Sequence, residues 1–146
     1  MGLFQSFDIC ASGMSAQRFR MDTIAENIAN VNTTRTEDGT PYRRKIVTFE
    51  EKLLKPSFAD ILSDTTKFQG NGVKVVRVSE DTETDFTMTY DPSHPDADEN
   101  GYVLLPNVNT VTEMTNLIDS SRAYEANATA FEAMKGMVQA GLQIGS

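Results

Sequence analysis

Residues 3–31, LFQSFDICASGMSAQRFRMDTIAENIANV, decide the fold of this chain, because their apolar side chains recur at alternating steps of four and three. This spacing lines them up as a narrow stripe along one side of an α-helix, as in a coiled coil. Only Gln17 is polar within the stripe. The predicted seam positions of this helix are Leu3, Phe7, Cys10, Met14, Met21, Ile24, Ile28 and Val31. The N-terminal segment is therefore predicted to be a long helix that needs a partner.

The C-terminal segment repeats the pattern, with Ser121 and Lys135 as its polar interruptions. Its predicted seam positions are Met114, Leu117, Tyr124, Ala128, Phe131, Val138 and Leu142. A helix over residues 3–31 would be roughly 45 Å long, which exceeds the width of a compact domain of this size. We therefore expect an elongated, coiled-coil-like hairpin of the two terminal helices, with Gln17, Ser121 and Lys135 as candidate markers of its register.

The apolar content is too large for the hairpin alone to cover. The chain has 146 residues, enough for one ordinary domain, and 39% of them are apolar. Phe4 and Phe19 lie off the first seam, and Ile118 and Met134 lie off the second. Two helices that pack only against each other would leave these side chains exposed. Self-assembly, or packing against homologous subunits, is the expected remedy.

The charge balance excludes one class of partner. Acidic residues outnumber basic ones by 21 to 13, and the net charge is −8, so a nucleic-acid partner is not expected. We interpret the one basic cluster, residues 43–45, as a solvated face. No stretch is continuously apolar over the length of a membrane span. The first cationic side chain is Arg18, so we expect no cleavable secretion signal.

The residues that could carry chemistry are few, and no catalytic site, cofactor or small-molecule substrate is expected. Cys10 is the single cysteine and His94 the single histidine, which leaves no nucleophile with its base and no thiolate metal site. Residues 96–101, DADENG, match the first six positions of a calcium loop. Position twelve is Asn107 rather than the bidentate glutamate. A calcium-binding module stays an alternative to an acidic turn, and we predict no metal.

The middle of the chain is predicted to be a small antiparallel sheet. Three runs have β-branched and aromatic content or period-two alternation, and they are residues 42–49, 73–78 and 86–90. A fourth strand-like run, residues 102–105, ends at Pro106. Residues 55–68 fit either a short helix or a loop.

The helix boundaries follow from capping signals. The first helix should end near residues 32–34, where short polar side chains compete for the backbone. Thr110 and Glu113 form a capping box, which predicts that the second helix starts at Val111. The predicted fold is α+β: an N-terminal helix within residues 1–34, a β-rich insert over 35–109 and a C-terminal helix within 110–146.

Several ordered motifs resemble the bacterial flagellar axial proteins, which build rod, hook and junctions. ASGMSAQR at residues 11–18 and NIANVNTT at 27–34 are similar to their N-terminal signature, and SRAYEAN at 121–127 to their C-terminal one. DPSHPDA at 91–97 with GYV at 101–103, and PNVN at 106–109 with Glu113-Met114, resemble the proximal-rod members. The matching motif residues are Asn27, Asn30, Asn32, Arg122, Tyr124, Glu125 and Asn127.

The resemblance implies a structural, non-enzymatic subunit of the periplasmic rod of the basal body. It implies export by the flagellar type III apparatus, and terminal helices that pair and pack with neighbouring subunits around the export channel. The implied partners are the other rod proteins and the adaptor that joins the rod to the membrane ring. A soluble coiled-coil dimer outside the flagellum is the other alternative, although it gives no reason for axial signatures at both ends.

Overall fold

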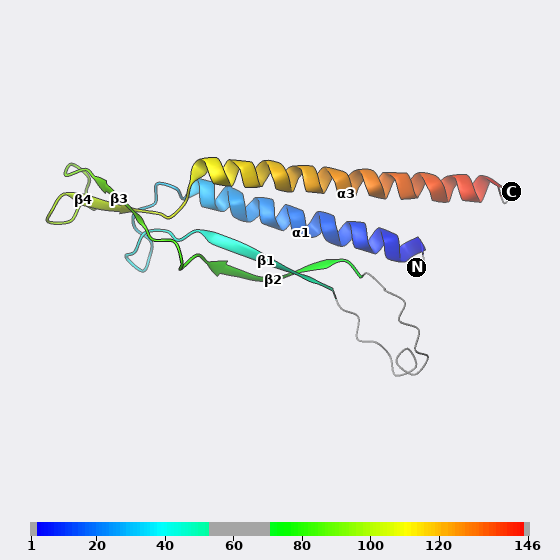
Figure 1. The fold of residues 1–146 in the computed structure, drawn as a ribbon, viewed down its shortest axis with the longest axis horizontal. Coiled ribbons are helices and arrows are strands. Elements are labelled where there is room, and N and C mark those ends of the chain that lie inside the picture. Colours follow the sequence, from blue (N-terminus) through cyan, green and yellow to red (C-terminus); the bar gives the residue numbers. More distant parts are fainter. Residues whose placement is uncertain (1–2, 53–70, 145–146) are drawn as a thin grey trace, which may run out of the picture.

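Two long antiparallel helices form the body of the molecule. The computed structural model describes residues 3–52 and 71–144. Helix α1 (Leu3–Ala29) and helix α3 (Thr110–Ile144) lie side by side, and the β elements fill the chain between them (Figure 1). The shape is elongated, with both chain termini near one end and the β3–β4 hairpin at the other (Figure 1). The predicted α+β fold with terminal helices and a small antiparallel β region is confirmed.

The β region consists of two separate ribbons, so the expected single sheet of three strands is wrong. Strand β1 (Lys45–Glu51) pairs antiparallel with β2 (Val73–Glu80), and β3 (Thr87–Tyr90) pairs antiparallel with β4 (Tyr102–Leu105). The chain leaves the first ribbon at Asp81, whose carboxylate accepts hydrogen bonds from the backbone N–H groups of Glu83 and Thr84. This local turn directs the chain away from β1 before the second ribbon begins.

The helix boundaries differ from the predicted ones at both junctions with the β region. Helix α1 ends at Ala29 rather than near residues 32–34, because tighter turns follow it. In these turns the Val31 N–H donates to the Ile28 carbonyl, and the Thr33 N–H donates to the Asn30 carbonyl. The predicted capping box of α3 is wrong. The Asn109 side chain is the cap, since its Oδ1 accepts from the N–H groups of Val111 and Thr112.

Close contacts of small residues hold β1–β2 against the start of α1. The Ser12 hydroxyl accepts a hydrogen bond of 3.1 Å from the Val73 N–H. Gly72 has a φ of +88°, and a Cβ there would lie 2.1 Å from the Ser12 oxygen. The first ribbon therefore lies along α1, as Figure 1 shows. The ambiguous segment 55–68 lies outside the described residues.

Candidate assembly surfaces and the polar junction

The helix hairpin brings most of the predicted seam positions between α1 and α3. Buried or half-buried seam side chains are Phe7, Cys10, Met14, Met21, Ile24, Ile28, Val31, Leu117, Tyr124, Ala128, Phe131 and Val138. The Phe7 and Phe131 rings meet edge to face, with centroids 4.9 Å apart. The Leu3 side chain is outside what the structure describes.

Met114 and Leu142 do not join the seam, because both are exposed. A strict seven-residue repeat drifts around an α-helix of 3.6 residues per turn, and Glu113 faces α1 in place of Met114. Leu142 lies beyond the start of α1. Since Phe7 contacts Phe131, the antiparallel register places residue 3 near Lys135. Residues 136–144, here called the overhang, therefore extend past Leu3, the first residue of α1 that the structure describes.

Small residues, which the apolar pattern did not single out, let the helices approach closely. Ala16 and Ser120 are both almost fully buried. A Cβ at Gly13 would lie 2.7 Å from Asn127 Oδ1, so the Asn127 amide occupies the space that a larger residue would need. The same amide donates to the Ala123 carbonyl of its own helix. Of the predicted register markers, Gln17 has a buried Oε1 with no hydrogen-bond partner within the described part of the chain, Ser121 is half-buried and Lys135 is exposed.

A buried cluster of polar side chains ties the C-terminal end of α1 to the start of α3 and to the β region. We call it the polar junction, and its members are Asn27, Tyr42, Arg44, Asp81, Asn107 and Glu113. Asn27 is 1% exposed and stands at its centre. Its Oδ1 accepts from the Tyr42 hydroxyl and from the Lys45 N–H, both at 2.9 Å. Its Nδ2 donates to the Lys45 carbonyl at 2.9 Å and to Glu113 at 3.0 Å. The amide therefore uses its full hydrogen-bonding capacity.

Glu113 is a buried charge that is fully paired. It is 1% exposed, and its Oε1 accepts from Arg44 Nε at 2.8 Å and lies 2.7 Å from Arg44 Nη2. Its other oxygen accepts from Asn27. A buried carboxylate is tolerated when an ion pair and further hydrogen bonds compensate its lost hydration. Glu113 therefore joins α3 to α1 and to the segment before β1 instead of capping its own helix.

Asn107 and Asp81 complete the junction on the side of the second ribbon. The Asn107 Oδ1 accepts from the Arg44 N–H at 2.8 Å, and its Nδ2 donates to the carbonyls of Asp81 and Thr84 at 3.0 and 3.1 Å. The pKa of the Asp81 carboxyl is lowered, mainly by the hydrogen bond from the Thr84 N–H. Burial alone would raise this pKa, but its effect is smaller. The positive charge of Arg44 makes a smaller contribution that also lowers the pKa of Asp81. The carboxylate thus stays ionised while it shapes the turn.

The expected role of the basic cluster changes at this junction. Residues 43–45 do not form a solvated face: Arg44 pairs with Glu113, Lys45 pairs with Glu26, and the Arg43 guanidinium stacks 4.4 Å from the Phe86 ring centroid. All three cations are engaged within the chain, because the strand start that carries them packs beside both helices.

The other motif residues divide between local and surface positions. Asn30 donates to the Glu26 carbonyl and accepts from the Thr33 hydroxyl, so it shapes the end of α1. Asn32 is exposed. Arg122 and Glu125 are exposed, and among the described residues no ion pair joins them. Motif residues therefore serve the internal junction (Asn27), the helix interface (Tyr124 and Asn127) and the outer surface.

Large apolar side chains remain exposed on the outer surfaces of both helices. Those on α1 are Phe4 and Phe19. On α3, Val111, Met114 and Ile118 recur at steps of three and four, and we call this stripe the outer helix patch. The overhang adds Met137, Leu142 and Ile144. Exposed apolar side chains that recur at helical spacing are typical of protein-binding surfaces.

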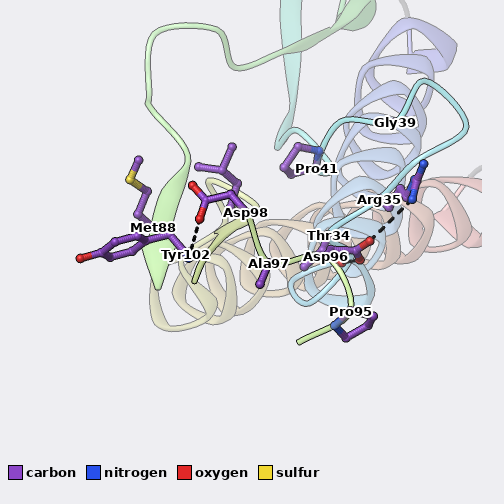
Figure 2. A pocket seen from close by; sticks show the side chains of 11 residues that line it. Thr34, Arg35, Gly39, Pro41, Met88, Pro95, Asp96, Ala97, Asp98 and Tyr102 are labelled. Carbon is purple, nitrogen blue, oxygen red and sulfur yellow. Dashed lines mark hydrogen bonds and ion pairs between the residues drawn. The ribbon is translucent and has the colours of Figure 1, made fainter. Parts of the chain in front are cut away.

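The β3–β4 ribbon also presents an apolar face. The register places Met88 opposite Leu104 and Tyr90 opposite Tyr102, and all four are exposed, whereas Val103 on the other face is 3% exposed. We call these four residues the hairpin face. Met88 and Tyr102 line a shallow, open cavity of about 390 Å³ together with residues from the segments 34–41 and 95–98. Figure 2 shows the side chains that line it. At its rim, Arg35 Nη1 lies 3.8 Å from Asp96 Oδ1, and Asp98 Oδ1 accepts from the Tyr102 N–H at 2.8 Å.

The calcium-like loop is held by its own hydrogen bonds. Asp98 Oδ1 also accepts from the Asn100 N–H, while Asp96 accepts from the Thr34 hydroxyl. Gly101 has a φ of +80°, which suits the turn into β4. His94 Nδ1 accepts from the Asp96 N–H. Within residues 3–52 and 71–144, no three histidine, cysteine or acidic side chains are grouped so that they could hold a metal ion. Among the same residues, no helix is long and apolar enough to cross a membrane.

Two family models match the terminal parts of the chain. The model described as "Flagella basal body rod protein" matches residues 7–35, and the one described as "Flagellar basal body rod FlgEFG protein C-terminal" matches residues 99–144. The first therefore covers most of α1 and the turn after it. The second covers β4, α3 and the connection between them, so the matches include both sides of the polar junction.

Curated relatives match over nearly the whole length. The chain is 45% identical to the flagellar basal-body rod protein FlgC of Bacillus subtilis, with 99% of each chain covered. It is 43% identical to FlgC of Aquifex aeolicus, with 92% of this chain and 91% of the relative covered. It is 37% identical to FlgC of Salmonella typhimurium, with 99% of each chain covered.

Proposed function

This chain belongs to the FlgC family of flagellar basal-body rod proteins and is a structural subunit of the rod in the flagellar basal body, and we propose that it assembles through the outer surfaces of α1 and α3. In this proposal it occupies the proximal rod and packs with its neighbours around the export channel. The role is structural, with no catalytic step.

The observation that carries the proposal is the outer helix patch. Val111, Met114 and Ile118 are more than half exposed on α3, although the other side of the same helix is packed against α1. Burial of apolar surface contributes roughly 25 cal/mol per Å², so covering such side chains with a neighbouring subunit favours assembly. Phe19 on α1 extends the available apolar surface to the second helix.

The three segments have different roles in this proposal. Residues 1–34 and 110–146 form the axial core, and its buried and half-buried seam residues hold the hairpin together. Residues 35–109 form an insert that is anchored by the polar junction, so its position relative to the helices is defined by hydrogen bonds of Asn27 and Glu113. The core contacts neighbours, and the insert orients the subunit among them.

The partners we propose are the other rod proteins, homologous subunits and the adaptor that joins rod to membrane ring. We further propose that the flagellar type III apparatus exports the chain. Membership of the rod protein family supports the first group of partners. The exposed apolar surfaces of α1 and α3 support direct helix-to-helix contact with them.

The test is a double variant, Met114→Lys with Ile118→Lys, expressed in a flagellated strain that lacks the native gene. Because both side chains are exposed in the subunit, the variant should keep the circular dichroism spectrum of the wild-type protein. We expect it to be lost from purified basal bodies, with motility abolished. Buried charge in a subunit interface is costly when no partner compensates it.

The matched control is Thr40→Lys with Thr82→Lys, which adds the same charge at two exposed polar positions outside both helices. It should assemble and support swimming. Normal incorporation of the Met114→Lys, Ile118→Lys protein would contradict the proposal, because the outer helix patch would then face solvent in the finished rod.

A further inference from the structure

We propose that the hairpin face docks a basic segment of a different protein, with an apolar centre in that segment. The inference goes beyond the proposed function, because it assigns a partner to the β-rich insert rather than to the helices. The hairpin face belongs to the β3–β4 ribbon, at one end of the elongated molecule (Figure 1). A contact there is separate from any contact at the outer helix patch.

The second ribbon projects from the body of the molecule. Among the described elements, none of α1, α3, β1 and β2 packs closely against β3 or β4. The buried Val103 lies on the opposite face from Met88 and Tyr90, which are 67% and 64% exposed. An isolated two-stranded ribbon is marginally stable in water, so a partner that covers its apolar face would stabilise it.

The hairpin face adjoins a hollow that suits an apolar anchor. Met88, Tyr102 and Leu104 line the shallow, open cavity of about 390 Å³, together with Pro41 and Pro95 from neighbouring loops. A large apolar side chain of a partner can enter this hollow from solvent. Because methionine and aromatic side chains are enriched at the centres of protein interfaces, the matching surface needs an apolar centre.

Acidic side chains flank the hairpin face at both ends of the ribbon. Residues 78–109 contain eight acidic side chains and no lysine or arginine, although the whole chain has 13 basic residues. Asp85 precedes β3, and Asp91 and Glu99 lie in the loop that joins β3 to β4. A partner surface with lysine or arginine around its apolar centre therefore complements this end of the molecule.

Basic side chains from elsewhere in the chain do not neutralise this acidic end. Arg35 lies 3.8 Å from Asp96, and Arg44 pairs with two buried carboxylates. Within residues 3–52 and 71–144, no ion pair involves Asp85 or Glu99, and both are exposed. Their charges are therefore available to a partner.

The same charge disfavours two other occupants of the hairpin face. A second copy of this chain itself carries a net charge of −8, and two hairpin ends would bring like charges together. An anionic lipid surface would be repelled for the same reason. A basic segment of another protein is the occupant that fits both the apolar face and its acidic surroundings.

The experiment measures the binding of three labelled synthetic peptides to the full chain by fluorescence anisotropy. The first peptide has an apolar centre between lysines, the second has the same centre between glutamates, and the third has a serine centre between lysines. We expect the first peptide to bind about tenfold more tightly than either of the others. Its binding should weaken as ionic strength rises, because salt screens exposed charges.

A double variant tests whether the contact lies on the hairpin face. Met88→Gln with Leu104→Gln removes apolar surface there and should weaken binding of the first peptide about tenfold. The matched control, Met137→Gln with Leu142→Gln, changes the same residue types at exposed positions of α3 and should bind as the wild-type protein does. Circular dichroism establishes that both variants are folded. Unchanged binding by the Met88→Gln, Leu104→Gln protein would overturn the proposal.

A second double variant tests the acidic surroundings. Asp85→Asn with Glu99→Gln should weaken binding of the first peptide about threefold and reduce its dependence on salt. The control, Asp8→Asn with Glu132→Gln, removes exposed charges from the two helices and should change neither. The proposal is also overturned if the first peptide does not bind, or if either of the other peptides binds as tightly.

The outcome is separable from that of the proposed function. The Met114→Lys, Ile118→Lys protein keeps the hairpin face and should bind the first peptide as the wild-type protein does. Normal incorporation of that variant into basal bodies would contradict only the role of the outer helix patch. Absence of peptide binding to the wild-type protein would overturn only the contact at the hairpin face.

Discussion

The two ends of the helix pair are held by different forces. At the polar junction, Asn27 and Glu113 connect α1, α3 and the segment before β1 through directional hydrogen bonds. At the opposite, open end, the Phe7–Phe131 contact joins the helices, and α3 continues past α1 as the overhang. Directional bonds define one register, whereas apolar contacts tolerate small shifts. The junction therefore specifies the geometry, and the open end keeps apolar surface available to neighbours.

The largest expected effect comes from breaking the junction with Glu113→Ala. The substitution removes the closer of the two carboxylate partners of Arg44, leaving only Asp81 at 3.7 Å, and it removes one hydrogen bond of the buried Asn27. We expect the free energy of unfolding, measured by urea titration, to fall by about 3–5 kcal/mol. Hydrogen exchange should accelerate in both helices and in β1.

Glu125→Ala is the matched control, since it removes an exposed glutamate from the same helix. It should change stability by less than about 0.5 kcal/mol. Similar losses in the two variants would mean that the junction contributes nothing beyond ordinary surface charge.

A smaller effect is expected from Phe131→Ala at the open end. The side chain is half-buried, so the loss should be about 2 kcal/mol, below the value for a fully buried phenylalanine. Faster hydrogen exchange should be confined to residues near the open end of both helices. Glu132→Ala, at the exposed neighbouring position, should leave exchange unchanged. Acceleration that spreads to β1 would contradict the division between the two ends.

The smallest effect on the free energy of unfolding is expected from removing the Tyr42 hydroxyl at the polar junction. Burial, and then the carboxylates of Glu26, Glu113 and Glu80, raise the pKa of Tyr42 to about 12 from its ordinary 10.0. The unfolded chain therefore ionises first, and stability should fall as pH rises from 10 towards 12. Tyr42→Phe should cost about 1 kcal/mol at neutral pH and reduce this alkaline slope.

Tyr90→Phe provides the comparison, because Tyr90 is exposed on the hairpin face. Urea titrations of the three proteins between neutral and alkaline pH measure the difference. If Tyr42→Phe and Tyr90→Phe have the same pH dependence, the buried hydroxyl is not the group responsible.

The long helices and their pairing could be predicted from the sequence, whereas the junction could not. Apolar periodicity is a local signal, and it identified Phe7 and Phe131 directly. The bond between Asn27 and Glu113 joins residues 86 positions apart, and nothing near Glu113 distinguishes it from a first-turn capping residue. The same long-range pairing explains why Arg44 was interpreted as solvated. Gly13 and Ser120 were missed because a close helix approach depends on the facing residue as well as on the local pattern.

The saturated hydrogen bonding of Asn27 has a mechanical consequence. All the donors and acceptors of its side chain are satisfied within the subunit, so Asn27 has no hydrogen bond left to offer a neighbour. The outer helix patch remains available to neighbours, and apolar contacts, being non-directional, resist sliding less than hydrogen bonds do. A shaft built from such subunits would yield to torque between its subunits before it yields within them.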